Sequence, residues 1–149
     1  MRILGIDYGQ ARIGVAKSDP TGLIAEPHLV LRRKTDELSA NEIARLAIEL
    51  EASRIVVGWP RNMNGSVGPG ALSCVQFADL LRETTGLPVD LYDERLTTVA
   101  AERLLISAEV NRKNRKKVID ALAASIMLQG YLDRRRQETA QESSPRSEE

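Results

Sequence analysis

Three acidic positions in this sequence lie where carboxylates could act together. Asp7 follows the apolar run ILGI, Asp93 and Glu94 end the segment VDLYDE, and Asp120 comes early in KKVIDALAASIMLQGYLD. A charge at the end of a buried strand is costly unless a hydrogen bond, an ion pair or a metal ion compensates it. Carboxylates brought close together cannot all ionise without a cation, and oxygen-rich clusters suit Mg²⁺ or Mn²⁺. Two such ions about 3.5–4 Å apart can activate a water and stabilise the leaving oxygen of a phosphodiester.

Each acid also has an ordinary structural explanation. A lone strand-end aspartate commonly serves a turn or a cap. Either acid of the VDLYDE segment could pair with Arg95, and Asp120 could pair with Lys116 or Lys117 one helical turn earlier. The case for a shared site therefore depends on where the fold places the three positions.

The apolar patterns predict the elements that position these acids. Strands are expected over 2–7, 12–18, 26–33, 54–60 and 89–94, and helices over 35–52, 70–85, 99–108 and 118–135. This order predicts an α/β fold with a mixed sheet, antiparallel at its front and parallel behind. If the first and fifth strands flank the fourth as parallel neighbours, Asp7 and the Asp93/Glu94 pair share one rim, where functional groups collect. A helix packed across that rim could bring Asp120 to the same place.

The charge of the chain is balanced but unevenly distributed. The 149 residues carry 21 basic and 21 acidic side chains, so composition alone does not indicate a nucleic-acid partner. Five of the six residues in 112–117 are basic, and Arg134, Arg135 and Arg136 form a second cluster. We expect one domain over residues 1–136 and a disordered acidic tail over 137–149.

Several classes of protein are disfavoured by the sequence. The one cysteine, Cys74, excludes an intramolecular disulfide and fits a reducing compartment. It makes no convincing nucleophile–base pair with His28, so a small buried thiol is expected. There is no apolar run near the ~20 residues of a membrane span and no signal-peptide pattern, which favours a cytoplasmic protein.

Other residues could contact a phosphate backbone. Asn64 and Ser66 lie in the loop NMNGSVGPGA after a predicted strand, and Arg12 and Arg95 lie beside the acids. The five cations of the predicted basic loop are candidates for backbone contact: Arg112, Lys113, Arg115, Lys116 and Lys117. Each set has an alternative explanation. The loop could be held by its own hydrogen bonds, the two arginines could form ion pairs with the acids, and the five cations could form a solvated charged face.

Glycine and tryptophan positions are also open to two interpretations. Gly5, Gly9 and Gly14 could let a nucleic-acid backbone approach closely, whereas Gly9 could instead serve a turn that requires positive φ. Trp59 could stack on a base, although a role in the core at the end of a strand fits better.

Four ordered motifs carry a family resemblance. GIDYGQARIGVA, VVGWPRNMNGSVGPGA, DERLTTVAAERLL and KKVIDALAASIMLQGYLD together resemble the YqgF/RuvX family, a bacterial branch of the ribonuclease-H-like, RuvC-type nucleases. The resemblance runs from residue 2 to about residue 133. It implies a five-stranded sheet of order 3-2-1-4-5. It also implies a magnesium- or manganese-dependent nuclease that matures the 5′ end of pre-16S ribosomal RNA, or a Holliday junction resolvase acting on branched DNA.

The same resemblance assigns the site. It carries the catalytic and metal-binding acids over to Asp7, Glu94 and Asp120, with Asp93 as a less favoured substitute for Glu94. Neighbouring strand residues point to opposite faces, so only one of that pair should reach the metals. The implied partners are nucleic acid and ribosomal particles, with the protein a monomer or a homodimer. A non-catalytic binding module in ribosome biogenesis is the alternative from a different class. A sugar-kinase-like ATPase is disfavoured because the chain has no room for a second nucleotide-binding half.

Overall fold

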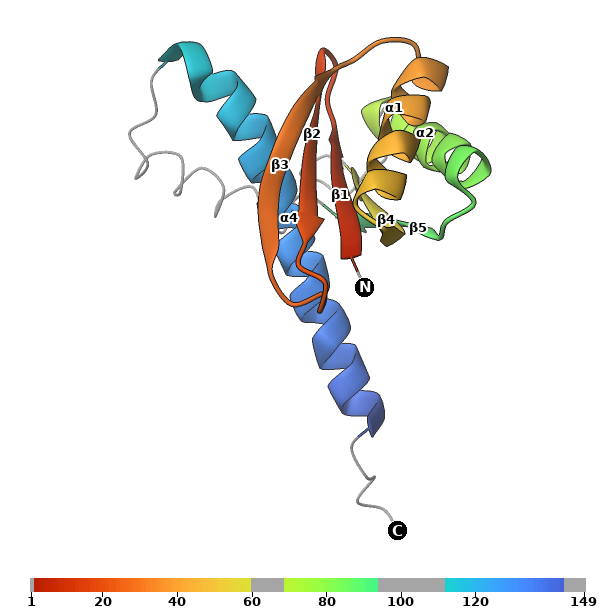
Figure 1. The fold of residues 1–149 in the computed structure, drawn as a ribbon, viewed down its shortest axis with the longest axis vertical. Helices are drawn as coiled ribbons and strands as arrows, with labels where there is room; N and C mark the ends of the chain where they lie inside the picture. Colours follow the sequence, from red (N-terminus) through yellow and green to blue (C-terminus); the bar gives the residue numbers. More distant parts are fainter. Residues whose placement is uncertain (1, 60–68, 94–111, 144–149) are drawn as a thin grey trace.

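The computed structural model describes residues 2–59, 69–93 and 112–143 (Figure 1). Its elements are β1 (Arg2–Tyr8), β2 (Arg12–Ser18), β3 (Ala25–Arg32), α1 (Asp36–Glu49), β4 (Ala52–Trp59), α2 (Pro69–Thr85), β5 (Val89–Asp93) and α4 (Arg112–Ser143). The helix predicted over 99–108 lies outside the described residues. Among the helices that are described, none is both long and apolar enough to span a membrane.

The five strands form one mixed sheet in the order β3-β2-β1-β4-β5, which confirms the predicted topology. The first three strands pair antiparallel, whereas β1–β4 and β4–β5 pair parallel. Helices α1 and α2 cover one face of the sheet, and α4 crosses the other face and extends past it at both ends (Figure 1). The α/β class and the predicted strand neighbours are therefore correct.

The two faces of the sheet bury separate apolar clusters because side chains alternate along each strand. Leu4 and Ile6 of β1 pack toward α1 and α2, together with the fully buried Phe77. Ile3 of β1 packs toward α4 in a smaller cluster that includes Leu128. The predicted buried thiol is confirmed, since Cys74 is 1% exposed and lies in the larger cluster.

Glycines on the α4 face allow that helix to approach the sheet closely. A Cβ atom on Gly5 would lie 2.9 Å from the Leu128 Cβ and 3.3 Å from the Ala124 carbonyl oxygen. The suggestion that Gly5 and Gly14 admit a nucleic-acid backbone is therefore wrong, because α4 occupies that space. Gly9 does not have a positive φ; its constraint is the Arg12 carbonyl oxygen, 2.6 Å from where a Cβ would be.

Capping residues define the ends of α1 and α2. Thr35 caps α1 by accepting a hydrogen bond from the Leu38 backbone N–H at 3.2 Å. The predicted end at residue 52 is too late, because Glu51 takes a left-handed conformation with φ 54° and turns the chain into β4. Gly86, with φ +71°, follows α2, whose last residue, Thr85, agrees with the predicted range, and the Gly86 N–H donates to the Arg82 carbonyl oxygen at 2.9 Å.

Helix α4 is longer than its apolar pattern indicates. Residues 112–117, expected to form a basic loop, belong to its first turns, and residues 137–143, expected in a disordered tail, continue it to Ser143. Lysine, arginine, glutamine and glutamate are good helix formers, so loss of apolar periodicity does not end a helix. Among its described side chains, the buried apolar ones are Ala121, Ala124, Met127, Leu128 and Leu132.

Candidate functional site

Asp7 lies one residue before the end of β1 and on the α4 face of the sheet. It alternates with Ile3 and Gly5, both of which contact α4, and its side chain is half-buried. Its partner across the antiparallel ladder is Gly14 of β2. Directly opposed residues in such a ladder have Cα atoms about 4.5–5.5 Å apart, so Gly14 lies immediately beside Asp7.

Asp120 reaches the same place from α4. Its main chain packs on Gly14: a Cβ atom on that glycine would lie 2.1 Å from the Asp120 carbonyl oxygen and 2.5 Å from its carbonyl carbon. Gly14 therefore borders Asp7 on one side and the Asp120 backbone on another. The fold brings these two acids together at one end of the sheet, as predicted from a helix crossing that rim.

Arg12 neutralises Asp120 in this structure. Its Nε donates to Asp120 Oδ2 at 2.5 Å, and the two side chains are 36% and 23% exposed. A half-buried carboxylate of this kind requires a positive partner. The guanidinium supplies that charge. Of the two roles considered for Arg12, phosphate contact and an ion pair with an acid, the structure shows the ion pair. The side chains of Lys116 and Lys117, the other candidate partners of Asp120, lie outside the described residues.

A partly buried network supports the turn that follows Asp7. The Tyr8 hydroxyl donates to Asp36 Oδ1 at 2.5 Å, and the Arg33 guanidinium lies 4.1 Å from the centre of the Tyr8 ring. Arg33 also donates to the Gly9 carbonyl oxygen at 3.0 Å. Burial, strengthened by Asp36, raises the pKa of Tyr8, so its hydroxyl remains a donor at neutral pH. Sequence reasoning missed this network; its signal was a tyrosine between Asp7 and Gly9.

The end of β5 presents Asp93 away from Asp7. Val89 and Leu91 belong to the cluster under α1 and α2, so alternation places Asp93 on that face. Tyr92, in contrast, packs toward α4. Asp93 therefore lies on the opposite face from Asp7, which agrees with the lesser weight given to it. Glu94, the favoured residue, lies outside the described residues.

The remaining predicted contact residues are not tested by the structure. Asn64, Ser66 and Arg95 lie outside the described residues. The cations of 112–117 are described only as part of the α4 backbone. Within the described parts of the chain, no group of three His, Cys, Asp or Glu side chains could hold a metal ion. Two of the three predicted metal ligands are thus placed, and the third belongs to the segment after β5.

Comparison with known proteins assigns the family. A family model described as "RuvX: Holliday junction resolvase" matches residues 1–134. The chain belongs to the RuvX family. Among RuvX relatives, a protein of Halothermothrix orenii is 52% identical over 133 residues, covering 89% of this chain and 95% of the relative. One of Desulforamulus reducens is 50% identical over 133 residues, covering 89% and 97%. Both are named "Putative pre-16S rRNA nuclease".

Solved structures show that this RuvX chain has the RuvC-like, ribonuclease-H-like fold. Thermus thermophilus RuvC in complex with a Holliday junction substrate matches with a TM-score of 0.59 at 15% identity, covering 92% of this chain and 96% of RuvC. The fowlpox virus resolvase in complex with Holliday junction DNA matches with a TM-score of 0.55 at 12% identity, covering 90% and 98%. At these identities the likeness concerns the fold, so the chemistry of the RuvX site must be argued from its own residues.

Proposed function

We propose that this RuvX protein is a divalent-metal-dependent nuclease that hydrolyses phosphodiester bonds. The observation that carries the proposal is the contact of the Asp120 backbone with Gly14, the ladder partner of Asp7. This contact places two carboxylates from distant parts of the chain at one end of the sheet. Two carboxylates at one end of a sheet are suited to hold the divalent cations that promote hydrolysis of a phosphodiester.

The donor set fits Mg²⁺ or Mn²⁺. Carboxylate oxygens are the ligands these ions prefer, and Arg12 already occupies the position of a compensating cation on Asp120. Asp7 and Asp120 would hold the metal, with Glu94 as the third ligand. Bound ions, two in this proposal, would supply activation of a water and stabilisation of the leaving oxygen.

The residues of the chain then have distinct roles. Asp7 and Asp120 provide negative charge for the cations, and the Tyr8–Arg33 network holds the turn after Asp7 in place. The Arg12 guanidinium, which pairs with Asp120 here, would also be placed to hold the phosphate, for which its planar fork of donors is well suited. Arg95 and the cations of 112–117 would hold the backbone on either side.

We infer that the substrate is the precursor of 16S ribosomal RNA, cleaved in the maturation of its 5′ end. The support comes from relatives that are 50% and 52% identical over nearly their whole length and are named for this activity. Ribosomal particles would then be partners. Cleavage of branched DNA is the second candidate, favoured by the description of the family model as a Holliday junction resolvase.

A parallel cleavage assay tests both candidates. Purified protein with Mg²⁺ or Mn²⁺ is given a pre-16S RNA fragment or a synthetic four-way DNA junction. We expect RNA cleavage near the mature 5′ end, abolished by Asp7→Asn. Asp79→Asn is the matched control, because Asp79 is an exposed carboxylate on α2. Cleavage of the junction alone would assign the second candidate. Binding without cleavage, with no metal uptake in a titration, would indicate a non-catalytic module.

A further inference from the structure

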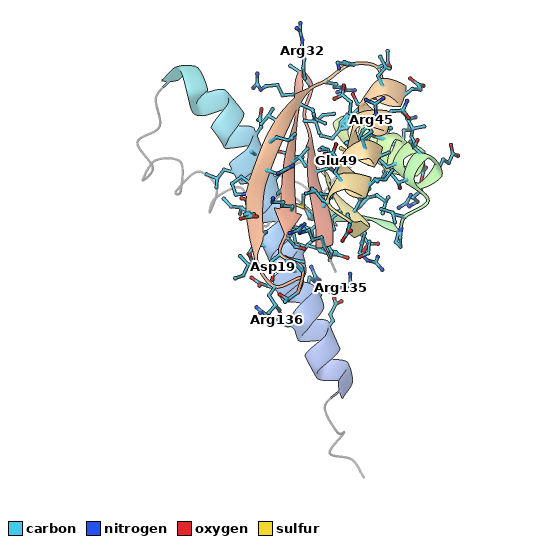
Figure 2. The ribbon with its side chains drawn as sticks, in the orientation of Figure 1. Asp19, Arg32, Arg45, Glu49, Arg135 and Arg136 are labelled. Atoms are coloured by element: carbon cyan, nitrogen blue, oxygen red, sulfur yellow. The ribbon has the colours of Figure 1, made fainter. Side chains whose placement is uncertain are left out.

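A charged hollow lies at the opposite end of the sheet from Asp7 and Asp120. Its volume is about 340 Å³, and its lining residues come from the starts of β4 and β5 and from α4: Arg54, Asp90, Tyr131, Arg134, Arg135 and Glu138. In Figure 2, Arg135 marks this end of the sheet. Arg32, the ladder partner of Arg12, marks the end where the acids lie.

The wall of this hollow is ordered by interactions on Asp90. Arg54 Nη1 donates to Asp90 Oδ2 at 2.8 Å, and the Tyr131 hydroxyl donates to the same oxygen at 2.5 Å. The Tyr131 ring packs edge-on against Tyr92 with 6.1 Å between ring centres. The Asp90 carboxylate is thereby held and compensated from within the protein, and Arg54 is fixed beside it.

The remaining charges leave an excess of positive charge. Among the described residues, three arginines and two acids line the hollow. Arg134 Nε lies 3.8 Å from Glu138 Oε1, and these side chains are 63% and 64% exposed, so water screens this long pair strongly. With Asp90 compensated by Arg54, Arg134 is held by this exposed pair with Glu138, and Arg135 lies beside it in the lining. Such a group of arginines is suited to a phosphate, which accepts several parallel N–H donors.

The hollow and the two acids share one face of the sheet. Tyr131, Arg134 and Arg135 belong to α4, the helix that also carries Asp120. Fifteen residues from Asp120 to Arg135 span about 22 Å at 1.5 Å per helical residue. This separation equals about six steps of a duplex, at about 3.4 Å per step along one strand. A nucleic acid that lies along α4 could therefore reach both places.

We propose that this arginine hollow binds a backbone phosphate of the nucleic-acid substrate about six nucleotide steps from the bond that is cleaved. The inference rests on the proposed nuclease function, since it states how far the bound substrate extends from the cleavage site. It adds a contact that positions an arm of the substrate and carries no sequence information. A small free anion, such as inorganic phosphate, presents the same chemistry and is distinguished by the test.

Charge-reversal variants test the proposal. Arg134→Glu reverses an exposed charge in the hollow, and Arg45→Glu makes the same change on α1, which covers the other face of the sheet (Figure 2). Arg135→Gln is a second, milder variant of the hollow. Binding to a labelled duplex DNA and a labelled duplex RNA is measured at several salt concentrations in Ca²⁺, so that the readout does not require cleavage. Thermal unfolding verifies that each variant is folded.

We expect Arg134→Glu to weaken binding about tenfold at low salt and to reduce the salt slope by about 0.9 on duplex DNA, the loss of one phosphate contact. Arg135→Gln should act in the same direction, and Arg45→Glu should change binding much less. Equal affinities and slopes for the Arg134→Glu and Arg45→Glu proteins would overturn the proposal.

Substrate length provides the second arm of the test. The effect of Arg134→Glu should disappear on an arm of about four base pairs beyond the cleavage site and be complete at about ten, because only the longer arm spans 22 Å. If Arg134→Glu weakens binding equally for every arm length, the proposed distance of about six nucleotide steps is overturned. Inorganic phosphate could instead stabilise the wild type while Arg134→Glu leaves duplex binding unaltered. That result would assign the hollow to a free anion and overturn the proposed backbone contact. An Arg134→Glu effect in a protein that cleaves no substrate would refute the nuclease function but keep the contact.

Discussion

The backbone of Asp120 packs directly on Gly14, with its carbonyl oxygen 2.1 Å from the position that a Cβ atom would take. Only a residue without a side chain allows this approach. Because Gly14 is the ladder partner of Asp7, the contact fixes the distance between a β1 acid and an α4 acid. The small residue at position 14 therefore links packing of the helix to assembly of the site.

Gly14→Ala should damage both stability and activity. The added methyl group would meet the Asp120 main chain, which is not the end of a flexible side chain, so α4 must shift. We expect a loss of about 1–3 kcal/mol in the free energy of unfolding, typical of overpacking, measured by urea denaturation. Cleavage by the folded fraction should fall at least tenfold.

Gly5→Ala is the matched comparison. Its methyl group would contact the Leu128 Cβ at 2.9 Å, a milder overlap on the same face of the sheet. Stability should fall less than in Gly14→Ala, and activity per folded molecule should be largely retained. Equal activity of the two folded variants would contradict the link between Gly14 and the site.

Arg12→Gln should change metal binding and cleavage in opposite directions. Arg12 holds the Asp120 carboxylate and so competes with a metal ion for it. Without the guanidinium, Mn²⁺ should bind several-fold more tightly in a calorimetric titration without nucleic acid. Cleavage should fall about a hundredfold, as when one charged donor to a reacting phosphate is lost. Lys17→Gln, which removes a cation from the other end of β2, is the control. Weaker Mn²⁺ binding in Arg12→Gln would contradict this role.

The one histidine makes stability depend on pH in the acid range. Burial, aided by the positive charge of Lys17, lowers the pKa of His28 from 6.5. A group whose pKa is lowered on folding favours the unfolded chain when protonated, so its contribution is complete above pH 6.5 and is lost as pH falls through the lower folded value. Wild type should therefore lose more stability than His28→Asn between pH 7 and pH 5, measured by denaturant unfolding at each pH. Identical slopes for the two proteins would show that His28 is not responsible.

The sheet and the meeting of Asp7 with Asp120 could be predicted from sequence because both follow from local patterns. Short apolar runs define the strands, and topology brings the end of β1, with Asp7, close to the part of α4 that carries Asp120. The Arg12–Asp120 pair could only be left as an alternative, because it depends on the rotation and register of α4 over a separation of 108 residues.

Other errors have physical reasons as well. The basic run 112–117 contains no apolar residue, which favours a loop, yet lysine and arginine propagate a helix readily. The sequence leaves open an approach of nucleic acid to Gly5 and Gly14, because it does not reveal which neighbour fills the space above a glycine. The network of Tyr8, Arg33 and Asp36 joins β1 to the β3–α1 connection and the start of α1, so in the sequence only the tyrosine after Asp7 marks it.

Metal binding and cleavage by Asp7→Asn test the proposed chemistry most directly. The substitution keeps the size of the side chain and removes the charge that the cations require. The variant should remain folded and bind nucleic acid in Ca²⁺ as the wild type does. Its Mn²⁺ affinity should fall and its cleavage of the preferred substrate should drop at least about a hundredfold, more than loss of a supporting group around a metal costs. Wild-type cleavage by a pure Asp7→Asn preparation with Mg²⁺ or Mn²⁺ would contradict the metal-dependent mechanism.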